Sequence, residues 1–271
     1  MRNDQCLHYL AFLNMELNKP SYDYLYQLCH AHLHTFAFEN ISKLILTDSG
    51  EDWIPSTEQF IENYSQHYFG GTCYTLNTSF MQLLLKIGFN CSPVKVGKDH
   101  LAIIVTLNEA NFYVDVGSAA PIFKPINLDL IEPSTRIFGS DKIQIIQTDS
   151  GYEYLRWKDN QKREMNWTFQ LNEIAEVDKF KPIYRKSVQP EASFMKILRC
   201  KVWQNNRDRS LSLFNNVFTI ENNNGDRTTT YLSTVNEMET VLDKEFKLKG
   251  MPIRAAMEIL EKRGVNVFVK E

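Results

Sequence analysis

The sequence predicts an α+β protein with helices first, strands in the middle and a mixed unit at the end. Up to about residue 68, apolar side chains recur at helical spacing, whereas residues 90–184 hold short apolar runs separated by turn residues. The remaining residues combine a hairpin pattern with helix-capping signals. We therefore expect three parts, at residues 1–88, 89–186 and 187–271.

Composition excludes several classes of protein. The 271 residues are 43% hydrophobic and 23% charged, which is ordinary for a globular chain, and the net charge of −3 gives no reason to expect a nucleic-acid partner. No apolar run approaches the roughly 18 residues of a membrane span, and the N-terminus lacks the apolar core of a signal peptide. The five cysteines are odd in number, with no C-x-x-C pair, so we expect reduced thiols and a cytoplasmic location. We also expect a monomer or homodimer.

The N-terminal part should contain capped helices. Tyr9, Phe12 and Leu13 form an apolar stripe, Ser21 can cap a second helix, and Ser56 with Gln59 forms a capping box. Three alternating histidines follow in the second helix, but no third ligand motif lies near them. We therefore interpret them as packing or surface side chains and predict no metal site; they are His30, His32 and His34.

The stretch Phe69–Asn77 holds the candidate nucleophile. Gly70 and Gly71 precede Cys73, and an apolar helical face follows at Leu76, Phe80, Leu83, Leu84 and Ile87. Cys73 is therefore expected in the first turn of a helix that stops near Gly88. Unpaired N–H groups and the helix dipole favour a thiolate there, although a lone cysteine is more often a buried hydrophobe.

A histidine and an aspartate follow on two predicted strands. His100 precedes the apolar run 101–105, and Asp115 lies near the end of the run 112–116. Antiparallel pairing across an even-length connection places both side chains on one sheet face. We expect a four-residue turn at 108–111, which offsets them by two pairs and would call for a bulge or bend. A thiol, a base and a carboxylate are the components of an activated-nucleophile site.

The rest of the middle part should be a curled antiparallel sheet or barrel, with a proline-containing loop after Asp115. Lys98 and Lys124 are near these residues in sequence but are more often solvated charges than phosphate ligands. The expected strands are 94–96, 102–105, 112–116, 143–146, 152–157 and 167–169. Near 187–200 we expect a helix or connector, followed by a hairpin of strands 214–220 and 228–232, helices starting near Thr234 and Pro252, and a possible last strand at 265–269.

These motifs resemble those of the arylamine N-acetyltransferases over nearly the whole chain. The 69–77 stretch is similar to that family's Arg-Gly-Gly-Tyr-Cys-Phe-Glu-Leu-Asn, and 36–41 is similar to its Ile-Pro-Phe-Glu-Asn-Leu. Asp99-His100 and 114–117 match its histidine and aspartate positions, and 214–219 with 224–226 resemble its last hairpin.

The resemblance implies acetyl transfer from acetyl-coenzyme A to an aromatic amine, hydrazine or N-hydroxyarylamine through an acetyl-cysteine, with ping-pong kinetics. It implies a Cys73–His100–Asp115 triad in a cysteine-protease-like core, a helical domain, a central antiparallel β-barrel and a C-terminal α/β lid, with coenzyme A between barrel and lid. Cys73 and the Val96-Gly97 backbone would hold the oxyanion, and the other substrate-side residues would be Phe38, Thr72 and Ser118.

The chain departs from the family pattern at three places. Phe69 replaces an arginine that usually pairs with a glutamate such as Glu39, Thr75 replaces a glutamate, and Ser118 replaces a phenylalanine that lines the acceptor pocket. Two other functions therefore remain possible interpretations of the sequence. One is a cysteine hydrolase or transglutaminase-like enzyme that attacks an amide, and the other is a non-catalytic relative that binds a ligand.

Overall fold

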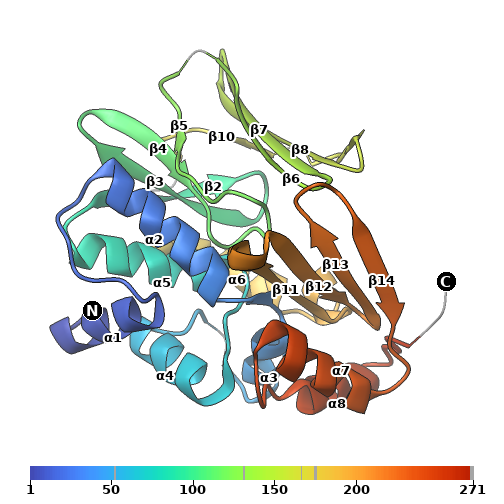
Figure 1. Cartoon of the computed structure of the whole chain (residues 1–271). Helices are drawn as coiled ribbons and strands as arrows, with labels where there is room; N and C mark the ends of the chain where they lie inside the picture. The colour runs from blue at the N-terminus through green and yellow to red at the C-terminus, as the bar shows by residue number, and fades with distance from the viewer. Residues whose placement is uncertain (52, 131, 166, 174–175, 269–271) are drawn as a thin grey trace.

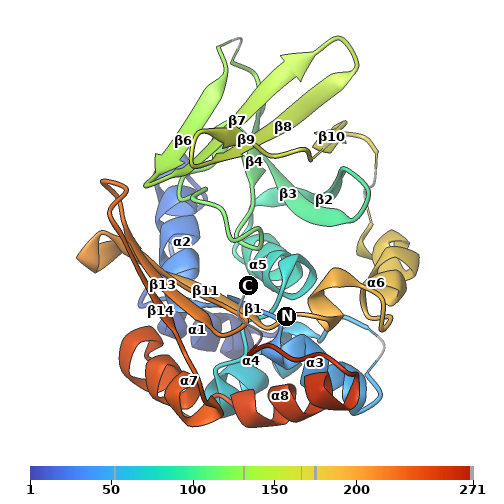
Figure 2. The ribbon, with the colours of Figure 1, turned by 90° about the vertical axis from the view of Figure 1, so that its right-hand side faces the viewer.

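The computed structural model describes residues 1–51, 53–130, 132–165, 167–173 and 176–268. Figure 1 shows the N-terminal helices beside two central sheets, with a third sheet and two helices from the C-terminal part. In the perpendicular view of Figure 2 the sheet of β6–β8 again lies at the end of the molecule opposite to α7 and α8. The α+β class is confirmed.

The N-terminal part is helical, as its periodicity predicts. Ser21 Oγ accepts a hydrogen bond from Tyr24 N, and Ser56 and Gln59 form the expected capping box. The apolar faces of these helices, except the helix Ile41–Asp48, share one core with the central strands, and this core fixes the helix Cys73–Lys86 against the middle of the chain. The helix Ile41–Asp48 packs into the core of the C-terminal part. The elements are α1 (Asn3–Phe12), α2 (Tyr22–Thr35), β1 (Phe38–Glu39), α3 (Ile41–Asp48), α4 (Thr57–His67) and α5 (Cys73–Lys86).

The three histidines of α2 contact three different residues. His32 is fully buried, and one ring nitrogen lies 3.0 Å from the hydroxyl of Tyr9. His34 contacts the carbonyl of Trp203, and His30 contacts the side chain of Asn205. Within the described residues, no group of three or more His, Cys, Asp or Glu side chains could hold a metal ion.

The central strands pair as two antiparallel sheets. One has the order β2-β3-β4-β5, and the other has the order β10-β8-β7-β6 with β9 added to β8. Their pairing among the described residues forms no closed barrel, although the sheets share an apolar core and Gly97 N donates to Thr168 O at 2.9 Å. The strands are β2 (Asn90–Val96), β3 (His100–Leu107), β4 (Ala110–Val114), β5 (Ile126–Asn127), β6 (Ser134–Phe138), β7 (Asp141–Thr148), β8 (Gly151–Lys158), β9 (Gln161–Lys162) and β10 (Trp167–Phe169).

The C-terminal part builds a third sheet that recruits a strand from the beginning of the chain. Its order is β1-β11-β12-β13-β14, and Phe38 of β1 pairs with Lys201 of β11. The short strand β1 thereby links the segment before α3 to the last part of the chain. The elements are η1 (Val177–Phe180), α6 (Lys181–Ser187), η2 (Ser193–Met195), β11 (Arg199–Gln204), η3 (Asn205–Arg207), β12 (Arg209–Phe214), β13 (Val217–Asn222), β14 (Arg227–Tyr231), α7 (Val235–Val241), the π-helical turn η4 (Leu242–Phe246) and α8 (Ile253–Lys262).

The segment 187–200 is a connector, one of the two alternatives expected, because α6 ends at Ser187 and β11 begins at Arg199. Three other predictions in this part were wrong. The predicted strand 214–220 contains a turn, since Phe214 pairs directly with Val217 and Asn215 has a left-handed φ of 51°. Residues 265–268 form no strand, and residue 269 lies outside the described residues. Pro252 caps α8 from outside rather than occupying its first turn.

No helix of the described residues is both long and apolar enough to cross a bilayer.

Candidate active site

Cys73 is the first residue of α5, as its sequence context predicts. Thr72 is the N-cap residue, is buried, and makes no capping hydrogen bond through its side chain. The glycines before it are required by close packing and by backbone shape. A Cβ on Gly70 would lie 2.0 Å from the carbonyl oxygen of Ala37, and Gly71 has a φ of +119°. The thiol, which is partly exposed, is therefore held at a helix N-terminus.

His100 begins β3, and Asp115 directly follows β4. The connection between these strands is a two-residue turn, because Leu107 pairs with Ala110, so the four-residue turn was a wrong prediction. Asn108 and Glu109 both have positive φ values, 51° and 67°, as this tight hairpin turn demands. The register pairs Ile103 with Val114, which brings Asp115 to within two residues of the position opposite His100, on the same face.

The His100 ring and the Asp115 carboxylate form a buried hydrogen-bonded pair. His100 Nε2 lies 2.8 Å from Asp115 Oδ2, and the two residues are 5% and 1% exposed. Three neutral groups also donate to this carboxylate: Asn77 Nδ2 at 2.9 Å, the Tyr113 hydroxyl at 3.1 Å and Gly117 N at 3.0 Å. The carboxylate is thus oriented by neutral donors, and His100 is the hydrogen-bond partner among the described residues that can carry a positive charge.

The charges at this site raise the proton affinity of the imidazole. Desolvation by itself would lower the pKa of His100, but the charges of Asp115 and Cys73 outweigh it and raise that pKa to about 10. Burial would raise the pKa of Asp115, yet the charge of His100 and the hydrogen bonds to the carboxylate hold it below its ordinary value. A cationic imidazole beside an ionised carboxylate is the favoured state near neutral pH.

Two further contacts fix the ring and the thiol. The indole of Trp167 stacks on His100 with ring centroids 4.6 Å apart and planes 11° from parallel. A Cβ on Gly117 would lie 2.7 Å from the Cα of Cys73. The loop after Asp115 therefore packs directly on the start of α5, and the charge of the Cys73 thiol is close enough to act on His100.

The other predicted site residues lie in several environments. Phe38 packs edge-on against Phe194, and Val96 pairs with His100 at the start of the β2–β3 hairpin. Gly97 N donates to Thr168 O at 2.9 Å. The Ser118 hydroxyl oxygen is buried without a hydrogen-bond partner in the described part of the chain, while the Ser118 carbonyl accepts from Arg156.

Glu39, for which the family resemblance implies an arginine partner at the position of Phe69, has hydrogen bonds from Ser42 instead. Its carboxylate accepts from Ser42 N at 2.8 Å and from Ser42 Oγ at 2.6 Å. Desolvation is the main influence and raises the pKa of Glu39 to about 7 in spite of these hydrogen bonds. Phe69 itself is 4% exposed and joins the apolar core of the C-terminal part.

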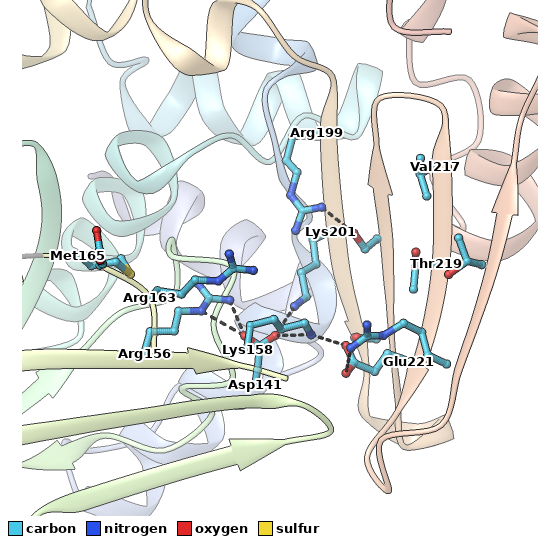
Figure 3. A pocket seen from close by; sticks show the side chains of 15 residues that line it. Asp141, Arg156, Lys158, Arg163, Met165, Arg199, Lys201, Val217, Thr219 and Glu221 are labelled. Carbon is cyan, nitrogen blue, oxygen red and sulfur yellow. Dashed lines mark hydrogen bonds and ion pairs between the residues drawn. The ribbon is translucent and has the colours of Figure 1, made fainter. Parts of the chain in front are cut away.

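A basic cavity of about 690 Å³ lies between β7–β8 and the C-terminal sheet (Figure 3). Asp141 is ion-paired with Arg156, Lys158 and Lys201 at 2.9–3.2 Å. Arg199 donates to Ser212 Oγ at 2.6 Å but forms no ion pair with the described carboxylates. Basic side chains outnumber acidic ones in the lining: Arg156, Lys158, Arg163, Arg199, Lys201 and Arg227 against Asp141, Glu164 and Glu221.

The cavity borders the catalytic candidates through two segments. Arg156 donates to the carbonyls of Ser118 and Ala119, in the loop that packs on Cys73. Met165 lines the cavity two residues before Trp167, which stacks on His100. Sequence reasoning missed these basic residues because strand charges usually face solvent. It also missed Asn77, whose position one helical turn after Cys73 was the available signal.

Comparisons with known proteins show which family and fold this chain shares. A sequence model described as N-acetyltransferase matches residues 21–251. Among solved structures, an arylamine N-acetyltransferase of Bacillus cereus, described as having a Cys-His-Glu triad, is 22% identical with a TM-score of 0.74, covering 92% of this chain and 100% of its own. The Mycobacterium marinum arylamine N-acetyltransferase in complex with CoA is 17% identical with a TM-score of 0.75, covering 95% and 97%.

One curated relative matches a smaller part of this chain. Proansamycin X synthase of Amycolatopsis mediterranei is 28% identical over 99 residues, which are 32% of this chain. The chain spans only 37% of that relative's length.

Together the fold, the Cys73 helix terminus and the matched sequence model define an acyltransferase. The chain belongs to the arylamine N-acetyltransferase family.

Proposed function

We propose that the protein transfers an acetyl group from acetyl-coenzyme A to an aromatic amine, hydrazine or N-hydroxyarylamine through an acetyl-Cys73 intermediate. The observation that supports it most is the buried His100–Asp115 pair beside a thiol at a helix N-terminus. In this proposal Cys73 is the nucleophile, His100 the acid and base, and Asp115 the residue that orients and charges the imidazole.

The proposed reaction has two halves with opposite proton movements. The Cys73 thiolate attacks the thioester carbonyl, the carbon–sulfur bond of the donor breaks, and the coenzyme A thiolate takes the proton of the His100 imidazolium. The amine then attacks acetyl-Cys73 and gives a proton to His100 as the cysteine thiolate leaves. The Cys73 N–H is the oxyanion donor we propose, since the Gly97 N–H is occupied by Thr168.

We further propose that coenzyme A binds in the basic cavity, with the C-terminal sheet acting as a lid against the two central sheets. The support is the excess of basic side chains there and an Arg199 guanidinium without a carboxylate. The M. marinum structure holds CoA, which is consistent with this donor. Phe38, Thr72, Val96 and Ser118 stay in the proposal as residues near the substrates.

Brief incubation with acetyl-coenzyme A followed by intact-mass measurement and peptide mapping tests the proposal. One acetyl group is expected, on Cys73, and none on a Cys73→Ala variant. Cys91→Ala is the matched control, because Cys91 is the other partly exposed cysteine and should leave labelling unchanged. Equal labelling of Cys73→Ala would contradict the assignment.

The same assay separates the alternatives. A hydrolase or transglutaminase-like enzyme would form its acyl-cysteine from amides rather than from acetyl-coenzyme A. Steady-state rates with an arylamine should give parallel double-reciprocal lines, whereas intersecting lines would point to direct transfer in a ternary complex.

A further inference from the structure

Lys43 in α3 is a buried lysine without a carboxylate partner. Lys43 is 6% exposed, and its Nζ donates one hydrogen bond, to Ser187 Oγ at 2.8 Å. No carboxylate of the described residues forms an ion pair with it. Desolvation lowers the pKa of Lys43 to about 8, against the raising influence of Cys73 and Asp99. Burying a cation without a directly paired carboxylate is unfavourable, so Lys43 is suited to bind a carboxylate that a ligand brings.

This ammonium lies beside the nucleophile. Nζ is 5.6 Å from the centre of the Tyr74 ring and 5.5 Å from that of Tyr184, and the two rings contact each other edge to face. Tyr74 directly follows Cys73, and the Cys73 side chain packs against the same aromatic cluster. The charge of Cys73 also acts on Lys43. A group attached to the Cys73 sulfur therefore lies close to this cation.

Another buried lysine, Lys201, has the carboxylate partner that Lys43 lacks among the described residues. Lys201 is 4% exposed and is ion-paired with Asp141 at 3.2 Å, so its counter-ion comes from the chain itself. Within the described residues, Lys43 Nζ contacts the Ser187 hydroxyl and two ring faces, none of which carries a negative charge.

We propose that the missing carboxylate arrives on the acyl group, and that Lys43 selects donors that are monothioesters of short dicarboxylic acids. This inference rests on the proposed function and specifies the substrate class of the same site. We assign the carboxylate to the acyl group because that group is bonded to Cys73 and so remains beside Lys43 throughout the lifetime of the acyl-enzyme.

The carboxylate takes no part in bond changes. Cys73 attacks the thioester carbonyl, the bond to the coenzyme A sulfur breaks, and His100 supplies the proton to that leaving sulfur. The distal carboxylate stays ionised and pairs with the Lys43 ammonium. Lys43 is thus a specificity-determining residue, and no proton has to leave it.

Acylation rates of Cys73 with four thioesters test the assignment. Malonyl- and succinyl-coenzyme A carry the charge, and isovaleryl- and 4-methylpentanoyl-coenzyme A have nearly the same shapes without it. The wild-type protein should favour at least one charged donor over its neutral match in kcat/KM, measured by intact mass under single-turnover conditions. In Lys43→Met this preference should fall at least about tenfold while the neutral rates stay within about twofold.

Two variants serve as controls. Lys43→Arg should keep part of the preference, because it retains the charge. Lys181→Met removes a more exposed lysine that lies over Trp53 and should change nothing.

The outcomes separate the two proposals. A wild-type preference for both neutral donors, or an equal loss for all donors in Lys43→Met, would overturn the role of Lys43 while leaving acetyl transfer intact. No labelling by any thioester, acetyl-coenzyme A included, would overturn the proposed function together with this inference. If Lys43→Met fails to fold, as judged by circular dichroism, the wild-type donor ratio alone decides.

Discussion

Two buried aspartates in neighbouring regions of the molecule have opposite surroundings. Asp115 and Asp141 are each 1% exposed. Asp115 receives three neutral donors and one imidazole, whereas Asp141 is ion-paired with two lysines and an arginine. In the proposed reaction the His100 imidazole gives up and regains a proton. Burial opposes the charge of Arg156, but Asp141 raises its pKa and keeps it cationic, while burial lowers the pKa of Lys201 to about 7. The first arrangement suits proton transfer, and the second suits a fixed electropositive wall.

The comparison predicts that Asp141→Asn has the largest effect on stability. Burial would raise the pKa of Asp141, but the charges around it lower that pKa. Its removal leaves the buried Lys201 and the half-buried Arg156 without their main counter-ion. Breaking such a buried pair typically costs about 3–5 kcal/mol. Urea unfolding at neutral pH checks this value. The Lys201→Met and Asp141→Asn double variant should be less destabilised than the sum of the two single changes, and simple additivity would show that the pair is not coupled.

Glu39 extends the comparison to a buried carboxyl group with no charged hydrogen-bond partner. Its raised pKa of about 7 means that the folded state holds a proton at pH values where the unfolded chain, with a pKa near 4.5, has lost it. Stability associated with Glu39 is therefore present below about pH 4.5 and decreases as the pH rises toward about 7. Glu39→Gln should flatten this dependence, giving a gain relative to wild type of about 1–3 kcal/mol at pH 8.

The control for Glu39→Gln is Glu58→Gln, since Glu58 is an exposed carboxylate whose pKa is lowered by Arg2. Denaturant unfolding between pH 5 and pH 8 measures both variants. An unchanged pH slope in Glu39→Gln would mean that Glu39 stays ionised when buried.

Replacing Arg199 should have the smallest effect on stability. The residue lies in the cavity but is not among the ion-pair partners of Asp141. Arg199→Met should raise the KM for acetyl-coenzyme A by about tenfold, equal to about 1.4 kcal/mol, with little change in stability. Steady-state kinetics at a fixed arylamine concentration measure it. The matched control is Arg227→Met, whose guanidinium is already paired with Asp159 and Glu221. An equal rise in both variants would indicate a general loss of positive charge.

The local sequence predicted the parts of the site that depend on short-range patterns. The start of α5 at Cys73 followed from the glycines and the helical apolar face, and the shared face of His100 and Asp115 followed from strand alternation. The turn length was missed because Asn108 and Glu109 both adopt left-handed φ angles, which is unusual for glutamate.

Long-range neighbours could not be obtained in this way. Strand β1 pairs with β11 across more than 150 residues, and this pairing carries Lys201 and Arg199 into the cavity. Trp167 contacts His100 from β10, which belongs to the other central sheet. Lys43 of α3 contacts Tyr184 of α6, which is distant in the sequence. Spacing within one segment contains no information about such contacts.

The single-turnover acetylation rate of an Asp115→Asn variant tests the account most directly. Asparagine keeps the size of the side chain but removes the charge that holds His100 as an imidazolium. In serine hydrolases the corresponding change lowers kcat about 10⁴-fold, and we expect a loss of at least about 10²-fold here, with an unchanged circular-dichroism spectrum. Asp99→Asn, an exposed neighbour of His100, should acetylate Cys73 at the wild-type rate. A loss of less than about tenfold in a folded Asp115→Asn protein would contradict the assignment of Asp115 as the residue that activates His100 and Cys73.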